Sequence, residues 1–456
     1  MLPGLGASSL EPPSRHAADN TLTLRWGSDE LAVALPPDWE LAGILEPASR
    51  PPVPDPAAEV RRALADPTDS PRLRDLARAD ARIAIVVDDA SRPTPVAQLL
   101  PAVLEELRAG GACDEQITIV TALGVHRPMS ADELAARVGR EALAAVRWEN
   151  HDCDDRARLA QLGTTVRGTP VWVNATVASA GVVVSIGCIE PHIIASFGGG
   201  SKNLVPGVAG RETIAHNHAL NCAPGTFSMV GQPIERNPMR MDLEEAAGML
   251  APPVFIVNAV LDAAQRVVQV VAGHPIAAHR AGVRTSAAMF GVRVDEPADV
   301  VIASSHPMDQ DLRQGVKALA NTLRAVRPGG VHITLVRATE GVGVMGLANR
   351  RLPLGRGALR ALAPLLLPLV PRVKLAGMGE EDRFFLYFAL QAMRRAALVL
   401  YAPTVPASAR AALPFVEFAE SPDGAVARAT RRFPARARVL AFPHGGITYP
   451  VMGDAS

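Results

Sequence analysis

The chain has 456 residues, enough for two domains that each bury a core of their own. Lysine plus arginine and aspartate plus glutamate both number 46, so the net charge is zero, and neither nucleic acid nor an anionic membrane is an expected partner. A hydrophobic fraction of 48% with 20% charged residues excludes wholesale disorder.

No part of the sequence looks like an export signal or a membrane span. Residues 1–20, expected to be a disordered leader, lack a basic stretch followed by an apolar core. The most apolar stretch, residues 361–371, is short and interrupted by prolines. The four cysteines are far apart and form no CxxC pair, which argues against a zinc ribbon or a disulfide scaffold. We therefore expect a cytoplasmic protein.

Short β-branched runs alternate with helical patterns through the first half of the chain. The pattern predicts strands at residues 83–87, 117–121 and 182–186, and helices over about 95–109 and 131–146. Hairpins at 164–174 and 255–271 interrupt the alternation. Mixed or mostly parallel sheets are therefore expected.

A second α/β set follows a boundary near residues 285–297. Its predicted elements are a strand at 299–305, a helix over 309–326, a strand at 331–336, a helix over 380–396, and strands at 397–401 and 439–442. The strand at 439–442 is the last element that the sequence predicts. We therefore predict an α/β protein with two α/β domains, residues 21–290 and residues 291–456.

The first polar cluster ends a buried-looking strand in the sequence VVDDASRPTP. Asp88, Asp89 and Arg92 follow the strand and precede a helix, which is where open α/β sheets bind ligands and where helix N-termini favour anions. The planar guanidinium of Arg92 could bind a carboxylate bidentately, with Asp89 orienting it. A purely structural Asp–Arg staple of the loop is the alternative.

A second strand runs into the sequence VTALGVHRP, and His126 lies just beyond its end. Imidazole titrates near neutral pH and so suits a general acid or base. A single loop histidine is more often a plain polar residue, so this motif carries little weight by itself.

The most informative block is the glycine-rich stretch PHIIASFGGGSKNLVPGVAG. It contains His192, then Gly198, Gly199 and Gly200, then Lys202. A triple glycine lets the backbone approach a phosphate or a ring closely, and Lys202 could bind that phosphate or form a covalent link. The spacing matches neither a Walker A motif nor the GxGxxG fingerprint of nicotinamide folds.

Two histidines, His216 and His218, follow on a predicted helix. Residues two apart on a helix point roughly 200° apart, so at most one of these histidines binds a given metal ion.

Lysine is rare in this chain, which contains only Lys202, Lys317 and Lys374. A retained lysine could serve ammonium chemistry that guanidinium cannot supply, and chance retention is the alternative. Gln314 and Lys317 lie three apart at the start of a predicted helix, so they share a face that could line a cleft. Lys374 is expected to be a surface residue.

Together, the motifs DDxxRPTP, GVHRP, PHIIASFGGGSKxxxPGVAG, ETIAHNH and HPxDxDxxQxxKAL resemble those of the lactate racemase family that uses a nickel-pincer nucleotide. The resemblance spans about residues 22–450. It implies two α/β domains with the active-site cleft between them, and most catalytic and cofactor residues in the N-terminal domain. The implied cofactor is a pyridinium-3,5-bisthiocarboxylic acid mononucleotide with a nickel ion.

The site roles are implied by the resemblance, position by position. Lys202 corresponds to the lysine that can bind the cofactor covalently as a thioamide, with Gly198, Gly199 and Gly200 as cofactor-binding neighbours, and His218 to the nickel ligand. His126 and His192 correspond to the acid/base pair, Asp89 and Arg92 to substrate-binding residues, and Gln314 and Lys317 to a polar pair near substrate and cofactor. Ser201 stands where the lactate enzyme has arginine, so the resemblance does not fix the substrate.

The implied reaction is racemisation or epimerisation of a lactate-like 2-hydroxy acid by reversible hydride transfer, because the Cα–H beside a carboxylate is a poor acid. The implied partners are the small 2-hydroxy acid and the enzymes that make the cofactor. Two other functions stay open. One is a zinc-dependent hydrolase with His126, His192 and His218 as ligands, and the other is a non-catalytic carrier of the nickel nucleotide. The oligomeric state is also open.

Overall fold

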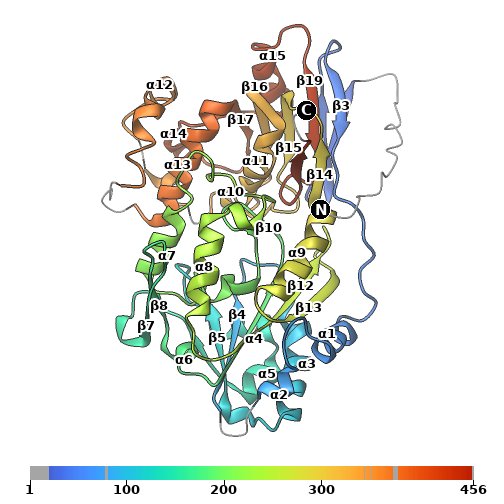
Figure 1. Cartoon of the computed structure of the whole chain (residues 1–456). Helices are drawn as coiled ribbons and strands as arrows, with labels where there is room; N and C mark the ends of the chain where they lie inside the picture. The colour runs from blue at the N-terminus through green and yellow to red at the C-terminus, as the bar shows by residue number, and fades with distance from the viewer. Residues whose placement is uncertain (1–19, 78–80, 344, 351, 373–377, 454–456) are drawn as a thin grey trace.

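The structure, a computed structural model, describes residues 20–77, 81–343, 345–350, 352–372 and 378–453. Residues 1–19 of the predicted leader lie outside the described residues, and so does Lys374. Two six-stranded sheets, one in each half of an elongated molecule, form the framework (Figure 1).

The first sheet contains β13, β12, β9, β4, β5 and β6 in that order. Its neighbours pair in parallel, except that β12 and β13 form the predicted antiparallel hairpin. Its strands are β4 (Ile83–Asp88), β5 (Ile117–Ala122), β6 (Arg147–Asn150), β9 (Val182–Cys188), β12 (Val254–Leu261) and β13 (Val267–Gly273). This mixed, mostly parallel sheet confirms the α/β class that the sequence pattern predicts.

Both faces of the first sheet are covered, which is why its central strands are almost entirely apolar. Ile83, Ile85 and Val87 of β4 pack into one core with α3, while Ala84 and Val86 face another core. The helices of this half are α1 (Pro56–Ala65), α2 (Leu73–Leu76), α3 (Val96–Ala109), α4 (Ala131–Val138), α5 (Arg140–Ala145), α6 (Ala175–Ala178), α7 (Arg211–Ala219), α8 (Pro238–Gly248) and α9 (Ala277–Phe290).

The single helix predicted over residues 131–146 is two helices, α4 and α5. Gly139 between them has a φ of 93°, which side-chain-bearing residues rarely adopt and which ends α4. Two short antiparallel hairpins complete this half. They are β7 (Leu159–Thr164) with β8 (Pro170–Asn174), and β10 (Pro191–His192) with β11 (Ser196–Phe197).

The second sheet contains β18, β17, β16, β15, β19 and β3 in that order, all parallel. Its strands are β3 (Glu40–Ile44), β15 (Ala298–Ser304), β16 (Val326–Leu335), β17 (Ala397–Tyr401), β18 (Glu417–Ala419) and β19 (Arg438–Phe442). The helices of this half are α10 (Leu312–Gly315), α11 (Lys317–Thr322), α12 (Arg356–Leu366), α13 (Glu380–Arg395), α14 (Ala407–Ala412) and α15 (Pro422–Thr430). The helix predicted over residues 309–326 is thus divided at Val316, and Val326 already begins β16.

The N-terminal strands lie with the second sheet. The hairpin of β1 (Thr21–Trp26) and β2 (Asp29–Ala34) packs Leu22, Leu24 and Val33 into the core of that sheet, and β3 pairs with β19. The division into residues 21–290 and 291–456 stays a prediction, but residues 21–44 do not follow it. A strand beyond the last predicted one, β20 (Tyr449–Met452), pairs with β14 (Gly291–Val294).

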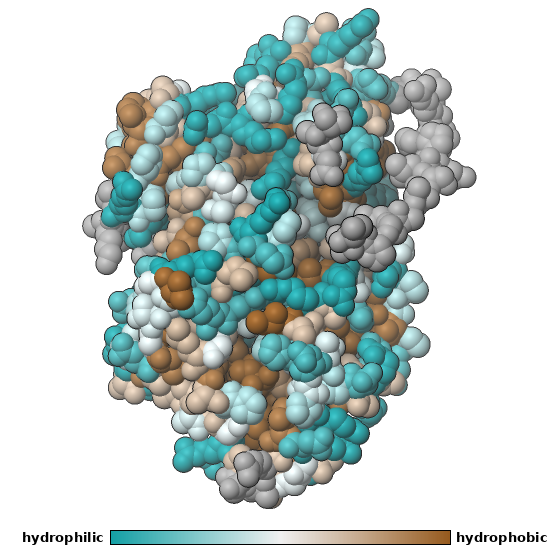
Figure 2. All heavy atoms as spheres, in the orientation of Figure 1, coloured by the Kyte–Doolittle hydropathy of each residue, from teal (hydrophilic) through white to brown (hydrophobic). Residues whose placement is uncertain are grey.

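The loops that follow β4, β5 and β9 line the same cavity as α10 and Lys317, which follow β15 in the chain. The cavity therefore lies where the two halves of the molecule meet. Within the described part of the chain, every helix is too short or too polar to cross a membrane. The face drawn in Figure 2 carries hydrophilic residues over both halves, with apolar groups between them.

Candidate functional site

A cavity of about 380 Å³ brings together eight of the residues singled out in the sequence. They come from the loops after β4, β5 and β9, from α7 and from the segment after β15. These residues are Asp89, Arg92, His126, His192, Lys202, His218, Gln314 and Lys317. Gly198, Gly199 and Gly200 are not among the lining residues. The roles of all these residues stay predictions.

The loop after β4 is fixed by an arginine that the sequence reading missed. Arg137 of α4 donates to the carbonyl oxygens of Asp88 at 3.0 Å and Arg92 at 2.9 Å, and it also pairs with the carboxylate of Asp88. The hydroxyl of Thr94 donates to the same carboxylate at 2.5 Å. The structural staple of this loop is therefore Asp88 with Arg137, which leaves Asp89 and Arg92 on the cavity wall.

Arg92 contacts Glu190 and not the predicted Asp89. The Nη1 atom of Arg92 lies 3.3 Å from Oε1 of Glu190, and both side chains are largely buried. Glu190 follows β9 by two residues, so the strand-end argument that selected Asp89 could also have found it. One edge of the Arg92 guanidinium is thus held by a carboxylate of the protein, which fixes the orientation of the fork.

Asp89 instead binds His126, whose Nδ1 lies within hydrogen-bond distance of Asp89 Oδ2. Burial by itself would raise the pKa of Asp89, but the hydrogen bonds from His126 and Ser91 and the charge of Arg92 lower it below its ordinary value. Asp89 is therefore ionised and accepts the Nδ1–H of His126. The lone pair of His126 is then on Nε2, which accepts from Nη2 of Arg313 at 3.2 Å.

His192 presents the opposite arrangement of its two ring nitrogens. Its Nδ1 accepts the backbone N–H groups of Ile194 at 3.3 Å and Ala195 at 3.1 Å. The neutral ring therefore carries its proton on Nε2. Burial, together with neighbouring positive charges of which Lys202 and Arg92 are the strongest, lowers the pKa of His192 well below its usual range.

The two histidines of α7 face different hollows, as their spacing predicts. His218 lines the cavity, and its Nδ1 lies 2.9 Å from the carbonyl oxygen of Ile214, so Nδ1 is the protonated nitrogen and Nε2 holds the lone pair. His216 lines a separate hollow, and its Nδ1 is 2.8 Å from the hydroxyl of Thr169. Only His218 can reach a group bound in the cavity.

The two lysines of the cavity have pKa values close to neutral pH. Burial and the charge of Arg92, partly offset by Glu190, lower the pKa of Lys202 to about 7. Burial lowers the pKa of Lys317 to about 8, with Glu190 opposing the shift and Arg92 adding to it. Near neutral pH, a large part of Lys202 is therefore a free amine, which is the nucleophilic form of lysine.

The three glycines before Lys202 approach protein atoms and not the cavity. Gly200 has a φ of 62°, and a Cβ there would lie 2.5 Å from Nη2 of Arg240 and 2.9 Å from the ring of His279. The fully buried Arg240 donates to the carbonyl oxygens of Phe197 and Gly199, each at 3.2 Å. The backbone at Gly200 thus lies against a buried guanidinium, and the role of the three glycines in binding a phosphate or a ring stays a prediction.

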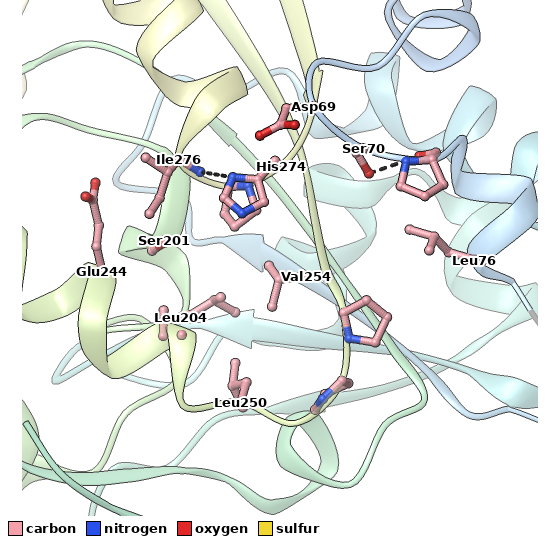
Figure 3. A pocket seen from close by; sticks show the side chains of 16 residues that line it. Asp69, Ser70, Leu76, Ser201, Leu204, Glu244, Leu250, Val254, His274 and Ile276 are labelled. Carbon is pink, nitrogen blue, oxygen red and sulfur yellow. Dashed lines mark hydrogen bonds between the residues drawn. The ribbon is translucent and has the colours of Figure 1, made fainter.

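Ser201 and Lys202 face opposite sides of the same turn. Ser201 lines a second cavity of about 350 Å³ behind the loop, together with Leu204, Glu244 and His274 (Figure 3). It does not line the cavity that contains Lys202. The serine at position 201 therefore contributes nothing to the wall of the candidate site.

The three histidines of the zinc alternative do not form a metal site. Within the described ranges, the only three potential ligand atoms close enough to share an ion belong to Asp152, Cys153 and Asp154. Nδ1 of His126 and Nδ1 of His192 are engaged by Asp89 and by the backbone, respectively. In the described part of the chain, His126, His192 and His218 are thus not arranged as a zinc ligand set.

Further lining residues from the second half of the chain have no motif of their own. Arg313 precedes Gln314 on α10, while Asp382 and Phe385 lie on α13. Ile193 and Ile214 add to the apolar wall. The sequence does not point to Asp382 and Phe385, because only the packing of α13 against α7 brings them to the cavity.

Comparison with known proteins gives consistent matches. The family described as the lactate racemase N-terminal domain matches residues 26–227. The chain is 32% identical to a lactate racemase of Thermoanaerobacterium thermosaccharolyticum over 329 residues, 71% of this chain and 76% of that protein. It is 30% identical to a lactate racemase of Lactiplantibacillus plantarum over 289 residues, 63% of this chain and 67% of that protein.

Solved structures agree with these matches. The lactate racemase apoprotein from T. thermosaccharolyticum superposes with a TM-score of 0.82 and 25% identity, covering 94% of this chain and 100% of that one. A protein from Thermotoga maritima superposes with a TM-score of 0.61 and 14% identity, covering 87% and 97% of the two chains, which shows a shared fold only.

We expect Gly200→Ala to destabilise the protein by about 2 to 4 kcal/mol, since it adds a left-handed backbone penalty to a clash with buried Arg240. Gly225→Ala is the control, because a Cβ there meets no atom within 4 Å. Urea unfolding of both variants measures the difference. Equal stability of the two would contradict the packing described for the loop.

The lowered lysine pKa values predict selective acylation. In a competition with acetic anhydride between pH 5 and pH 10, the labelling rate of Lys202 should reach half its maximum near pH 7, and that of Lys317 near pH 8. Only the unprotonated amine reacts, and its fraction increases with pH, so both rates rise with pH. Mass spectrometry of peptides reads the result, and a midpoint near pH 10 for Lys202 would refute its burial among cations.

Proposed function

The chain belongs to the lactate racemase family, and on that premise we propose that this isomerase interconverts the enantiomers of a lactate-like 2-hydroxy acid by reversible hydride transfer to a nickel-pincer nucleotide. The observation that carries the proposal is the convergence on one cavity of a carboxylate-binding guanidinium, an aspartate-bound histidine, a near-neutral lysine and a second histidine with a lone pair on Nε2.

In this proposal Arg92 binds the substrate carboxylate. Its guanidinium is oriented by Glu190, and the backbone around it is fixed by Arg137. Asp89 contributes through His126, since its carboxylate sets the tautomer of that ring. Gln314 and Lys317 would bind polar groups from the side of the second sheet. Holding the carboxylate and hydroxyl at fixed points makes the chemical step effectively intramolecular.

His126 is suited to remove the hydroxyl proton of the substrate. Its Nε2 carries the lone pair, and the ionised Asp89 stabilises the imidazolium that forms. The Cα–H of a 2-hydroxy acid is a poor acid, because deprotonation beside a carboxylate would give a dianion. Loss of hydride avoids the dianion and leaves a planar 2-keto acid. Return of hydride to one face or the other of this acid gives one or the other enantiomer of the 2-hydroxy acid.

The residues of the cavity fit the nucleotide that the family implies. His218 presents an imidazole lone pair, a suitable ligand for nickel, and Lys202 is neutral enough to acylate. The buried Oε1 atom of Gln314 has no hydrogen-bond partner among the described residues, so the site offers an acceptor for a donor that binds there. When bound, the nucleotide supplies an electrophilic pyridinium ring that accepts hydride.

We place His218 as the nickel ligand and Lys202 as the residue for covalent attachment in this proposal. Gly198, Gly199 and Gly200 would contribute only through the position of Lys202, since they do not line the cavity. The enzymes that build the nucleotide are the proposed partners. The four cysteines, all in the described part of the chain, form no disulfide, which supports the cytoplasm as the compartment.

Co-expression with cofactor-synthesis enzymes tests the proposal. The purified protein should contain nickel and a mass adduct on the Lys202 peptide, and chiral chromatography should show that either lactate enantiomer, or another 2-hydroxy acid, reaches a 1:1 mixture. A loaded protein that racemises no 2-hydroxy acid would instead be the carrier, and zinc without nickel would overturn the cofactor assignment.

His218→Ala should lose most of its nickel, whereas His216→Ala should keep it, because only His218 faces the cavity. Elemental analysis of the two loaded variants, purified in parallel, measures the ratio of nickel to protein. The His216 variant controls for changes in α7. Equal nickel contents would contradict the ligand assignment.

A further inference from the structure

The most apolar stretch of the sequence, residues 361–371, lies at the surface of the molecule and not in its core. It belongs to α12 and to the turn that continues this helix, where the backbone N–H of Val370 still donates to the carbonyl oxygen of Leu366 at 3.1 Å. The helix packs against α13 and fully buries one narrow stripe. The buried side chains of this stripe are Leu359, Ala363 and Leu367. Most of α12 is therefore exposed.

The exposed side of α12 is apolar. Apart from Arg360, each exposed residue from 357 to 369 is glycine, alanine, proline or leucine. The exposed fractions of Leu362, Leu365 and Leu369 are 37%, 69% and 50%. Apolar residues gather over α12 in Figure 2. A surface helix normally turns polar side chains outward, so the outer face of α12 is suited to contact an apolar phase or a partner.

The segment that contains α12 is positively charged. Residues 341–379 contain six arginines and lysines and no aspartate or glutamate. The net charge of zero for the whole chain conceals this local excess, because the remaining residues compensate it. The apolar face is thus part of a cationic segment, which favours an anionic surface as its contact.

A cavity of about 350 Å³ beside the start of α12 concentrates this charge. Arg356, Arg360 and Arg432 line it, together with the carboxylate of Glu417. That carboxylate binds three arginines, at 2.7, 2.9 and 2.8 Å, and these are Arg356, Arg428 and Arg431. One carboxylate shared in this way leaves the cavity an excess of positive charge, which suits a phosphate group.

Three kinds of occupant fit an exposed apolar face, and the observations favour a lipid bilayer. A second copy of the chain would bring like charges together, since the same arginines border the face in both copies. A protein partner is usually held by aromatic anchors, whereas leucine is under-represented among the residues that dominate such interfaces. Apolar side chains that insert beside arginines that bind phosphate are the combination found in interfacial helices.

We propose that α12 docks on an anionic phospholipid surface, with Leu362, Leu365 and Leu369 inserted at the acyl boundary and the arginines of the adjacent cavity bound to lipid phosphates. The helix has 11 residues, so it lies in the interface and does not cross the bilayer. The expectation from net charge, which places anionic membranes outside the partners of this protein, fails for this segment because its charge is local. The proposal does not depend on the proposed reaction.

Flotation of the full chain with vesicles tests the proposal. The protein should rise with vesicles of equimolar phosphatidylcholine and phosphatidylglycerol, and it should bind vesicles of phosphatidylcholine alone roughly tenfold more weakly. Leu365→Glu should weaken binding to the anionic vesicles by roughly tenfold, because it places a charge at the acyl boundary. Val166→Glu is the matched control, since Val166 is 91% exposed on the turn between β7 and β8. Thermal melting of both variants checks that they fold.

Tryptophan fluorescence reports insertion directly. The emission of Leu365→Trp should shift to shorter wavelength when anionic vesicles are added, whereas that of Val166→Trp should not. Equal binding of Leu365→Glu and the wild type, or no shift for Leu365→Trp, would overturn the proposal. A wild type that floats with neither kind of vesicle would also overturn it. In that case, a dimer that Leu365→Glu dissociates in analytical ultracentrifugation would identify a second copy as the occupant, and a monomer would indicate a different protein.

Discussion

A single buried guanidinium organises the candidate site. Arg240 is fully buried, and its nitrogen atoms are bound by the carboxylate of Glu244, by two carbonyl oxygens of the glycine-rich loop and by the ring of His279. A cation at that depth is tolerated only when its donors are satisfied, so the loop must supply its carbonyl oxygens in fixed positions. The turn that follows then directs Lys202 into the cavity and Ser201 away from it.

The charges of the cavity are balanced so that its lysines stay reactive. Glu190 raises the pKa of Arg92, Lys202 and Lys317, and Asp89, which also binds His126, adds a weaker effect on Arg92 and Lys202. Burial and the mutual repulsion of the cations outweigh these carboxylates at both lysines, whose pKa is therefore lowered. The same shortage of negative charge favours an anionic substrate and an anionic nucleotide in the cavity. The uncompensated positive charge thus lowers the stability of the folded protein and strengthens the binding of anions in the cavity.

The sequence allows the residues that follow strand ends to be predicted. It does not allow most contacts that depend on packing between distant segments to be predicted. Asp89, Arg92, His126 and His192 could be selected because parallel strands bring their carboxyl ends together, and all four line the cavity. The pairing of β3 with β19 could not be predicted from the sequence, since it joins segments almost 400 residues apart. The strand-end argument could also have found Glu190, whereas Arg137 could not be found, because its partners are defined only in the folded chain.

The two histidines show the same limit at the level of single atoms. A motif places an imidazole beside the substrate, but only the backbone of the turn after His192 decides which nitrogen carries the proton. A resemblance between families therefore transfers residues more securely than it transfers their protonation states.

The central claim is that the stereocentre is inverted by hydride transfer with no proton exchange at C2. Racemisation of one lactate enantiomer by the loaded enzyme in D₂O, followed to equilibrium by mass spectrometry, tests it most directly. The account predicts that both enantiomers keep the original hydrogen at C2 and gain no deuterium there. Incorporation of one solvent deuterium at C2 for each inversion would contradict it and would identify proton abstraction as the reaction.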